Sequence, residues 1–277
     1  MYVQRPIAIL DSGVGGLTVV KEVMRQLPLE RIIYFGDTAR TPYGPRPAAE
    51  VQQFTREIVD YLIQFNPKMI VIACNTATAV ALDLIRDCCE VPVIGVIYPG
   101  ARAAIGLTQS GQVGVIGTEG TIQSGAYEQA LKRLNPHIHV LSQACPAFVP
   151  LVEQGNFRSS ETLAAVEQSL RTLKQGQIDS LILGCTHYPF LTETIAEVMG
   201  PDVRLISSAD ETAREISTIL QTQGMLASQN IVPIHQFCCS GEAQMFKTIA
   251  QQWLNEEIVQ TPVVWHVPKI GTLPKIG

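Results

Sequence analysis

Two cysteines stand in similar surroundings in distant parts of the chain, and both could do acid–base chemistry. Cys74 lies in the segment Val71-Ile-Ala-Cys-Asn-Thr76, and Cys185 lies in Ile182-Leu-Gly-Cys-Thr-His187. Each is expected after a buried strand and at the start of a helix, where the helix dipole favours a thiolate and lowers the pKa of the thiol. Two thiols on opposite sides of one carbon can act as base and acid, since one removes a proton and the other delivers one to the opposite face. The pair therefore indicates a racemase or epimerase that uses two bases.

The surroundings of the two cysteines favour a reaction without a cofactor. No lysine lies beside either cysteine motif to hold pyridoxal phosphate as a Schiff base. A soft, poorly hydrated thiolate also suits the removal of a proton from carbon. No Cys-x-x-Cys spacing occurs, and the seven cysteines are an odd number with two adjacent pairs. We therefore expect neither a metal site nor a disulfide framework.

Further polar residues directly follow predicted strands or the two cysteines. They are Asp11, Ser12, Asn75, Thr118, Thr186 and His187. In an open α/β sheet, ligands bind outside the carboxyl ends of the strands. We therefore expect these side chains to gather around one ligand.

Strand-like apolar runs and amphipathic helical patterns alternate along the chain, which is typical of an α/β protein with parallel sheets. A first set of strands is predicted at 7–10, 32–35, 69–73 and 93–96, with helices over 17–27, 48–65 and 76–88. A second set is predicted at 113–116, 138–141, 181–183 and 203–206, with helices near 124–134 and 161–175. A helix over 209–223 and two returning strands at 232–237 and 262–267 follow.

The second set of elements repeats the first. Ile7-Ala-Ile-Leu-Asp-Ser12 is similar to Val113-Gly-Val-Ile-Gly-Thr118, and the two cysteine segments match in the same order. We predict two pseudo-symmetric α/β domains, each a mainly parallel sheet flanked by helices, with the active site in the cleft between them. Residues 1–97 together with 210–267 are expected to form the first domain and 98–209 the second. Residues 268–277 repeat a Pro-Lys-Ile-Gly unit and are expected to be a loose tail.

The composition excludes several classes of protein. The 277 residues are 46% hydrophobic and 16% charged, which allows a large core and argues against disorder. The net charge of −5 is thinly spread and no basic block occurs, so nucleic acid or an anionic membrane surface is not an expected partner. The apolar runs are of strand length, too short to span a membrane, and no signal peptide is evident. We expect a soluble protein of the reducing cytoplasm.

Five motifs, taken together, resemble the bacterial glutamate racemase family of the aspartate/glutamate racemase superfamily. They are Asp11-Ser-Gly-Val-Gly-Gly-Leu-Thr18, Gly36-Asp-Thr-Ala-Arg-Thr-Pro-Tyr-Gly44, Cys74-Asn-Thr-Ala-Thr-Ala79, Gly117-Thr-Glu-Gly-Thr121 and Leu183-Gly-Cys-Thr-His-Tyr-Pro-Phe-Leu191. The resemblance implies an isomerase that interconverts L- and D-glutamate without pyridoxal phosphate and supplies D-glutamate for peptidoglycan synthesis. We further expect a homodimer, with glutamate as the small-molecule partner.

The resemblance also implies a role for individual residues. Cys74 would act on the proton of the D-enantiomer, assisted by Asp11, and Cys185 would act on that of the L-enantiomer. His187 and Glu153 would assist on the Cys185 side. The substrate would be held through hydroxyls and amides by Asp11, Ser12, Tyr43, Gly44, Asn75, Thr76, Thr118, Thr121, Thr186 and His187.

Other interpretations of the same residues remain open. The substrate of a racemase could be aspartate or a hydantoin, and a one-thiol decarboxylase would not require both cysteines. A cysteine hydrolase could use Cys185 as nucleophile and His187 as base, although a residue two positions along a helix start rarely points at its neighbour's thiol. A non-catalytic binding protein with a cleft between two domains is a further alternative. Gly13-Val-Gly-Gly16 resembles a phosphate-binding loop but lacks the Gly-Lys-Ser/Thr ending. Arg40 could be a bidentate carboxylate clamp or a solvated loop residue, and it is left outside the predicted site.

Overall fold

The computed structural model describes residues 4–228, 232–254 and 263–266, whose strands form two parallel sheets. The first sheet has the order β10-β9-β2-β1-β3-β4, and all neighbouring strands in it run parallel. Its strands are β1 (Ile7–Asp11), β2 (Ile32–Gly36), β3 (Met69–Ile72), β4 (Val93–Gly95), β9 (His235–Cys239) and β10 (Val263–His266). The last two come from the far end of the chain, so the first sheet joins both ends of the sequence.

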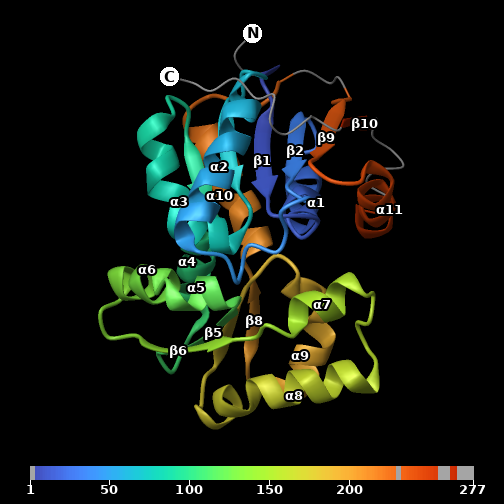
Figure 1. Ribbon diagram of the computed structural model, residues 1–277. Coiled ribbons are helices and arrows are strands. Elements are labelled where there is room, and N and C mark those ends of the chain that lie inside the picture. The colour runs from blue at the N-terminus through green and yellow to red at the C-terminus, as the bar shows by residue number, and fades with distance from the viewer. Residues whose placement is uncertain (1–3, 229–231, 255–262, 267–277) are drawn as a thin grey trace.

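The second sheet has the order β6-β5-β7-β8 and is also parallel throughout. Its strands are β5 (Gln112–Gly117), β6 (His139–Ala144), β7 (Ser180–Gly184) and β8 (Arg204–Ser207). In Figure 1 the two sheets lie in separate halves of the molecule, the second below the first. The prediction of two parallel sheets flanked by helices is confirmed.

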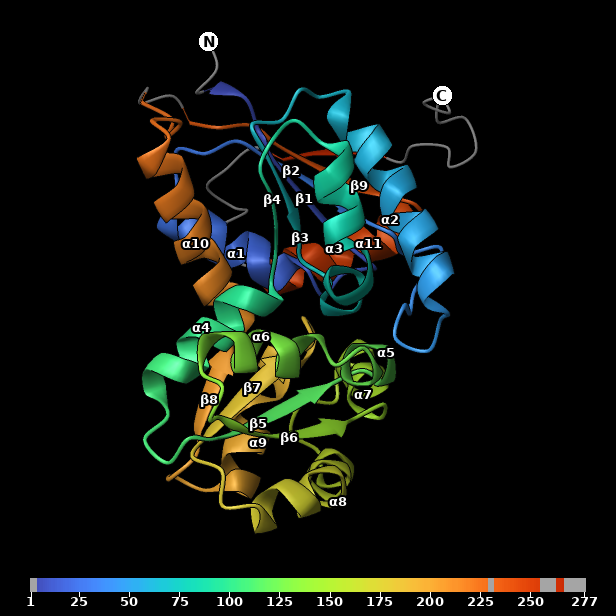
Figure 2. The same ribbon diagram turned by 90° about the vertical axis from the view of Figure 1, so that its left-hand side faces the viewer.

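Helices cover both faces of each sheet, as Figure 2 shows for α1 and α10 against α2 and α3. On the first sheet, α1 (Leu17–Gln26), α10 (Ser208–Thr222) and α11 (Ala243–Leu254) cover one face, and α2 (Ala48–Ile63) and α3 (Asn75–Cys88) cover the other. On the second sheet, α7 (Phe148–Glu153), α8 (Ser160–Gln175) and α9 (Thr192–Met199) pack opposite α4 (Ile97–Leu107) and α6 (Ala126–Leu134). Two short helices, α5 (Glu119–Gln123) and the 3-10 helix η2 (Tyr188–Leu191), complete the second half.

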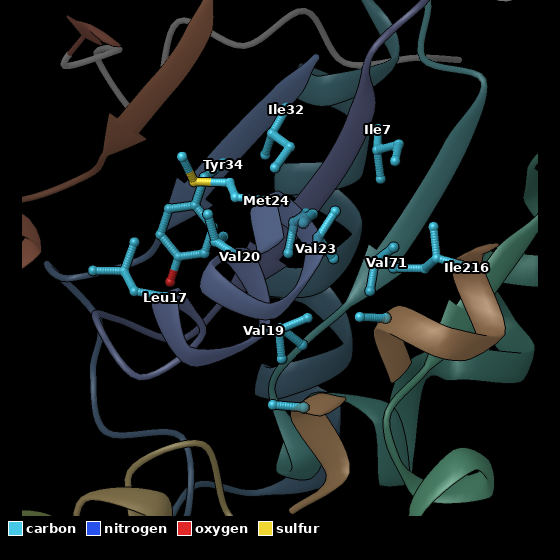
Figure 3. Packing of buried hydrophobic residues seen from close by; sticks show 14 of the residues in the cluster. Ile7, Leu17, Val19, Val20, Val23, Met24, Ile32, Tyr34, Val71 and Ile216 are labelled. Atoms are coloured by element: carbon cyan, nitrogen blue, oxygen red, sulfur yellow. The ribbon is translucent and has the colours of Figure 1, made fainter. Parts of the chain in front are cut away.

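The central strands are mostly apolar because both of their faces are covered, and Asp11 at the end of β1 and Ser180 at the start of β7 are buried polar exceptions. In β1, Ile7 and Ile9 belong to the core beneath α1 and α10, whereas Ala8 and Leu10 belong to the core beneath α2 and α3. Figure 3 shows the first of these cores, where side chains of α1 pack against residues of β1, β2 and β3. This double burial fixes the strands firmly, so the residues that follow them are held on a rigid support.

Several helices were not predicted from the sequence, namely α4, α5, α7, η2, α9 and α11. Helix α4 contains Pro99, Gly100 and Gly106, which are poor helix formers. Proline is tolerated at Pro99 because it lies in the first turn, where the amide hydrogen has no partner within the helix. The three elements α5, α7 and η2 have only four to six residues each, too few for a helical period to be recognised.

The predicted strand at 232–237 was wrong at its start, since β9 spans His235–Cys239. Val232 and Ile234 are 61% and 54% exposed, so these apolar residues do not belong to the sheet. Strand β8 belongs to the second sheet while α10, which follows it directly, packs on the first. The domain boundaries, 1–97 with 210–267 against 98–209, stay a proposal, and the predicted tail at 268–277 lies outside the described residues.

Candidate active site

Residues that follow strands of both sheets line one small cavity between the two halves. The lining residues are Ser12, Thr41, Pro42, Tyr43, Gly44, Cys74, Asn75, Thr76, Thr118, Val149, Cys185, Thr186 and His187. The cavity has a volume of about 20 Å³, which is room for about one water molecule. Its walls must therefore separate before a larger ligand can enter.

Most of the predicted site residues line this cavity, and three contact it through a neighbour. Asp11 lies behind the wall and accepts a hydrogen bond from Thr186 Oγ1 at 3.5 Å. Thr121 reaches the hydroxyl of Thr76, and Glu153 reaches the ring of His187. The sequence analysis did not identify Thr41, Pro42 and Val149 as site residues. Pro42 and Val149 have apolar side chains, and Thr41 lies in a loop and does not directly follow a predicted strand.

Cys74 is the N-cap of α3 and is buried against Asp11 and Ser12. Its Sγ accepts a hydrogen bond from the amide of Ala77 at 3.4 Å and donates to Ser12 Oγ at 3.6 Å. Burial, reinforced by the charge of Asp11, raises the pKa of Cys74 to about 12, although Ala77 and Ser12 act in the opposite direction. The expectation that the helix dipole lowers the pKa of this thiol was therefore wrong, because desolvation outweighs the dipole. At neutral pH Cys74 is a thiol and can donate a proton.

The carboxyl group of Asp11 is completely buried beside Cys74. Its Oδ2 accepts a hydrogen bond from the amide of Gly13 at 3.0 Å. Burial raises the pKa of Asp11, while the positive charge of His187 and nearby backbone amides lower it. Asp11 therefore interacts electrostatically both with Cys74 and with His187, which lies beside Cys185.

Cys185 lies beside the imidazole of His187, in a position that differs from the predicted one. The chain after β7 forms a turn and the short 3-10 helix η2 rather than an α-helix, and Pro189 in that segment lacks an amide hydrogen. The turn brings Cys185 Sγ to 3.9 Å from His187 Nδ1. The expectation that His187 would not point at this thiol was wrong, because it assumed helical geometry.

His187 is a buried cation at neutral pH. Its Nε2 lies 3.4 Å from Glu153 Oε1, and its side chain is 5% exposed. Burial alone would lower the pKa of His187, but its contacts with Cys185 and Glu153 and the nearby Asp11 raise it to about 10. An imidazolium beside Cys185 stabilises negative charge on that sulfur. The two thiols therefore have different surroundings, since Cys74 is buried beside the carboxyl group of Asp11 and Cys185 lies beside the imidazole of His187.

Three threonine hydroxyls from the two halves form a cluster at one end of the cavity. Thr76 Oγ1 lies 2.9 Å from Thr118 Oγ1 and 3.2 Å from Thr121 Oγ1, and the last two lie 3.0 Å apart. Asn75, the neighbour of Thr76, accepts a hydrogen bond at Oδ1 from the hydroxyl of Tyr127 at 2.7 Å. Its Nδ2 is buried and has no hydrogen-bond partner within the described part of the chain, which leaves this donor available to a ligand.

The hydroxyl of Tyr43 is directed away from the cavity. It donates a hydrogen bond to Oδ2 of Asp37, a completely buried carboxylate. Tyr43 lines the cavity together with Gly44, but Asp37, which holds its hydroxyl, does not. Arg40 bridges Asp37 and Glu57 and is not aimed at a ligand. Sequence reasoning missed Asp37, although it follows β2 directly, which is the same signal that identified Asp11.

No group of three or more His, Cys, Asp and Glu residues within the described ranges is arranged to hold a metal ion. None of the helices in those ranges is long and apolar enough to cross a membrane.

Comparison with known proteins defines the class to which this fold and site belong. The family profile described as Asp/Glu/Hydantoin racemase matches residues 15–216. The chain is 54% identical to the glutamate racemase of Bacillus cereus, over 93% of this chain and 96% of that protein. It is 51% identical to the glutamate racemase of Enterococcus faecalis, over 92% of this chain and 93% of that protein. The chain therefore belongs to the Asp/Glu/Hydantoin racemase family.

Solved structures agree with this assignment. Glutamate racemase isoform RacE1 from Bacillus anthracis matches with a TM-score of 0.90 and 50% identity, covering 94% of this chain and 97% of that one. Glutamate racemase from Francisella tularensis, solved in complex with D-glutamate, matches with a TM-score of 0.88 and 35% identity. The match covers 97% of this chain and 98% of the Francisella chain. The predicted fold class and family resemblance are thereby confirmed.

Proposed function

We propose that this protein is a glutamate racemase that interconverts L- and D-glutamate by means of two thiols and without a cofactor. One observation carries the proposal: Cys74 and Cys185, which come from opposite halves of the molecule, line the same cavity. The high identity to proteins named glutamate racemase supports glutamate as the substrate. D-Glutamate made here would supply peptidoglycan synthesis, and hence the building of the cell wall and the maintenance of cell shape.

The surroundings of the two thiols support a direction for each proton. His187 stabilises a thiolate on Cys185, so Cys185 removes the α-proton of L-glutamate: the Cα–H bond breaks and an S–H bond forms. Cys74, whose thiol is protonated at neutral pH, then gives its proton to the opposite face of the same carbon. The product is D-glutamate, and the charges on the two sulfurs have exchanged. The reverse reaction starts from the Cys74 thiolate, to which Ser12 and the Ala77 amide donate hydrogen bonds.

Neutral donors hold the two carboxylates of the substrate in this proposal. No lysine or arginine of the described chain lines the cavity. Asn75 and Thr76 are the first two residues of α3, where unpaired backbone amides and the helix dipole favour an anion. The free Nδ2 of Asn75 adds a side-chain donor at the same place. Ser12, Thr118, Thr121, Thr186 and the segment Tyr43–Gly44 complete the binding site that we propose.

Two further properties belong to the proposal. We place the enzyme in the cytoplasm, where its seven cysteines would stay reduced. We also propose that it acts as a homodimer, which sedimentation at several protein concentrations would test.

The function is tested by incubating the enzyme with L-glutamate and following the optical signal, without added pyridoxal phosphate or metal. The mixture must approach equal amounts of the two enantiomers, because they have equal free energies in water. Activity that begins only when pyridoxal phosphate is added would contradict the mechanism. Activity that persists after exhaustive chelation supports it.

Replacement of each thiol tests the division of labour. Cys74→Ala and Cys185→Ala should each lose racemisation in both directions by many powers of ten, because every turnover needs one acid and one base. Exchange of the α-proton with solvent deuterium should survive on one side only. Cys74→Ala should still exchange L-glutamate, and Cys185→Ala should still exchange D-glutamate. Cys88→Ala, which changes an exposed cysteine, is the matched control.

If Cys74→Ala racemised at nearly the parent rate, the two-thiol mechanism would be wrong. Racemisation would then depend on a single-cysteine mechanism, for which the contact between Cys185 and His187 provides the candidate pair.

A further inference from the structure

The glycine-rich loop between β1 and α1 packs its backbone against the acid–base residues of the opposite half. A Cβ atom added to Gly15 would lie 2.6 Å from Nδ1 and 2.7 Å from Cε1 of His187, and closer still to Oγ1 of Thr186. Distances this short are steric clashes. The backbone of Gly15 does not adopt a left-handed conformation, so the need for glycine here comes from space and not from φ.

Neither side of this contact is free to retreat. On the loop side, Tyr34 donates a hydrogen bond to the carbonyl of Gly13 at 2.7 Å, and the side chain of Val14 is buried in the core of the first half. The hydroxyl of Thr18 donates to the carbonyl of Gly15 at 2.8 Å and lies 3.3 Å from the carbonyl of Thr186. The loop is therefore fixed to its own half and also joined to the other.

His187 is fixed from the opposite direction. Its ring is buried, its Nε2 lies beside Glu153, and the ring of Trp253 packs edge-on against it with centroids 6.2 Å apart. The Nδ1 atom that an added Cβ would approach is the same atom that faces Cys185 Sγ at 3.9 Å. A side chain at position 15 would therefore occupy the same edge of the imidazole that faces Cys185.

We propose that Gly15 is a positioning residue whose bare Cα keeps the Nδ1 edge of His187 open to Cys185. The inference rests on the proposed function, in which His187 supports Cys185 as the base toward L-glutamate. The inference also explains why Gly13-Val-Gly-Gly16 is rich in glycine although it does not match a phosphate-binding motif. The backbone of this loop closely approaches the opposite half of the protein.

The test compares Gly15→Ala with Gly106→Ala, which adds the same methyl group where no atom lies within 4 Å. In a Cys74→Ala background, Gly15→Ala should lower the exchange of L-glutamate by about tenfold or more, the size expected for losing a charge-assisted contact. In a Cys185→Ala background, the exchange of D-glutamate should fall by less than about threefold, because Cys74 does not contact His187. Gly106→Ala should change neither rate.

A measurement without substrate separates the inference from the proposed function. The NMR signal of His187 Cε1, assigned with a His187→Asn variant, should titrate near pH 10 in the parent and move toward the ordinary value of about 6.5 in Gly15→Ala. If the single-cysteine parents exchange neither enantiomer, the proposed function fails, but this titration still tests Gly15. An unchanged titration, or equal losses of exchange on the two sides, would overturn the inference.

A second variant covers the outcome that Gly15→Ala fails to fold. His187→Ala removes the ring, and Thr186→Ala removes the hydroxyl that an added Cβ would approach most closely. The triple variant Gly15→Ala/Thr186→Ala/His187→Ala should therefore fold with the thermal midpoint of Thr186→Ala/His187→Ala. If the triple variant also fails to fold, the clash does not act through these two side chains and the inference is wrong.

Discussion

The buried side chain of Asp37 fixes the loop at residues 41–44, which lines the cavity. Its Oδ2 accepts hydrogen bonds from the hydroxyl of Tyr43 and from Arg40 Nε, the latter at 2.7 Å, and its Oδ1 accepts from Ser240 Oγ at 2.6 Å. Burial and the charge of Asp37 raise the pKa of Tyr43, so its hydroxyl remains a donor at all ordinary pH values. Asp37 itself does not line the cavity. It should therefore act on the substrate only through the loop at 41–44.

Asp37→Asn changes the charge and one hydrogen-bonding atom while keeping the shape of the side chain. The amide nitrogen cannot accept, so at least one of the three donors loses its partner. A hydrogen bond to a charged group contributes about 1.5–3 kcal/mol, which corresponds to a factor of about 10–100 in an equilibrium constant. We expect KM for glutamate to rise by about that factor, because the loop no longer holds its binding position. The value of kcat should change by less than about threefold, since the surroundings of both thiols are intact.

The assay measures KM and kcat in both directions from the optical signal. Tyr43→Phe, which removes one neutral donor, should raise KM by about fivefold, corresponding to about 1 kcal/mol. Glu57→Gln is the matched control, because it weakens the other partner of Arg40 and leaves the bond between Asp37 and Tyr43 intact. A lower thermal midpoint for Asp37→Asn with unchanged KM would refute the reasoning. So would a loss confined to kcat.

Two further predictions concern stability. Lys68 and Glu30 are 0% and 2% exposed and their side-chain N and O atoms lie 2.5 Å apart, so Lys68→Met should lower the free energy of unfolding by about 3–5 kcal/mol. Lys68→Met/Glu30→Leu should recover only part of it, because Lys68 also donates to the Met225 carbonyl and Glu30 also accepts from the Ala227 amide. Urea unfolding measures both, and a double variant no more stable than the single one would contradict the argument. Burial and the charge of Arg31 lower the pKa of His235 to about 4, below its ordinary value of 6.5. The stability that neutral His235 contributes is therefore complete above about pH 6.5 and is lost as the pH falls through about 4. His235→Gln should therefore reduce the decline in the free energy of unfolding between those pH values by roughly 3 kcal/mol. Urea unfolding at each pH measures this, and equal declines in both proteins would exclude it.

The sequence predicted most accurately the elements whose hydrophobic pattern has a single physical cause. The strands β1, β2, β3 and β7 are covered on both faces, so most of their positions are apolar and can be recognised as continuous runs. Residues that follow such strands must lie at one edge of the sheet. For this reason the sequence predicted that Cys74 and Cys185 lie near each other, and both line the same cavity.

The parts that could not be predicted depend on contacts between distant segments. The state of the Cys74 thiol depends on burial beside Asp11, and the direction of the Tyr43 hydroxyl depends on Asp37. Neither is a property of the local sequence. The approach of His187 to Cys185 depends on a turn that ends in a 3-10 helix, and a helical period of a few residues cannot distinguish that turn from an α-helix.

The internal repeat predicts symmetry, but the proposed chemistry requires that the two thiols differ. A two-base racemase must hold one sulfur protonated while the other is charged, since a pair of thiols has no base and a pair of thiolates has no acid to give. After Cys74, the chain enters α3 directly, and burial together with the charge of Asp11 favours the thiol form of this sulfur. After Cys185, the chain turns instead and returns the cation of His187 to the sulfur. The departure of the second copy from the first, the histidine in place of a helical threonine, therefore provides the charge difference that the first step of the proposed reaction requires.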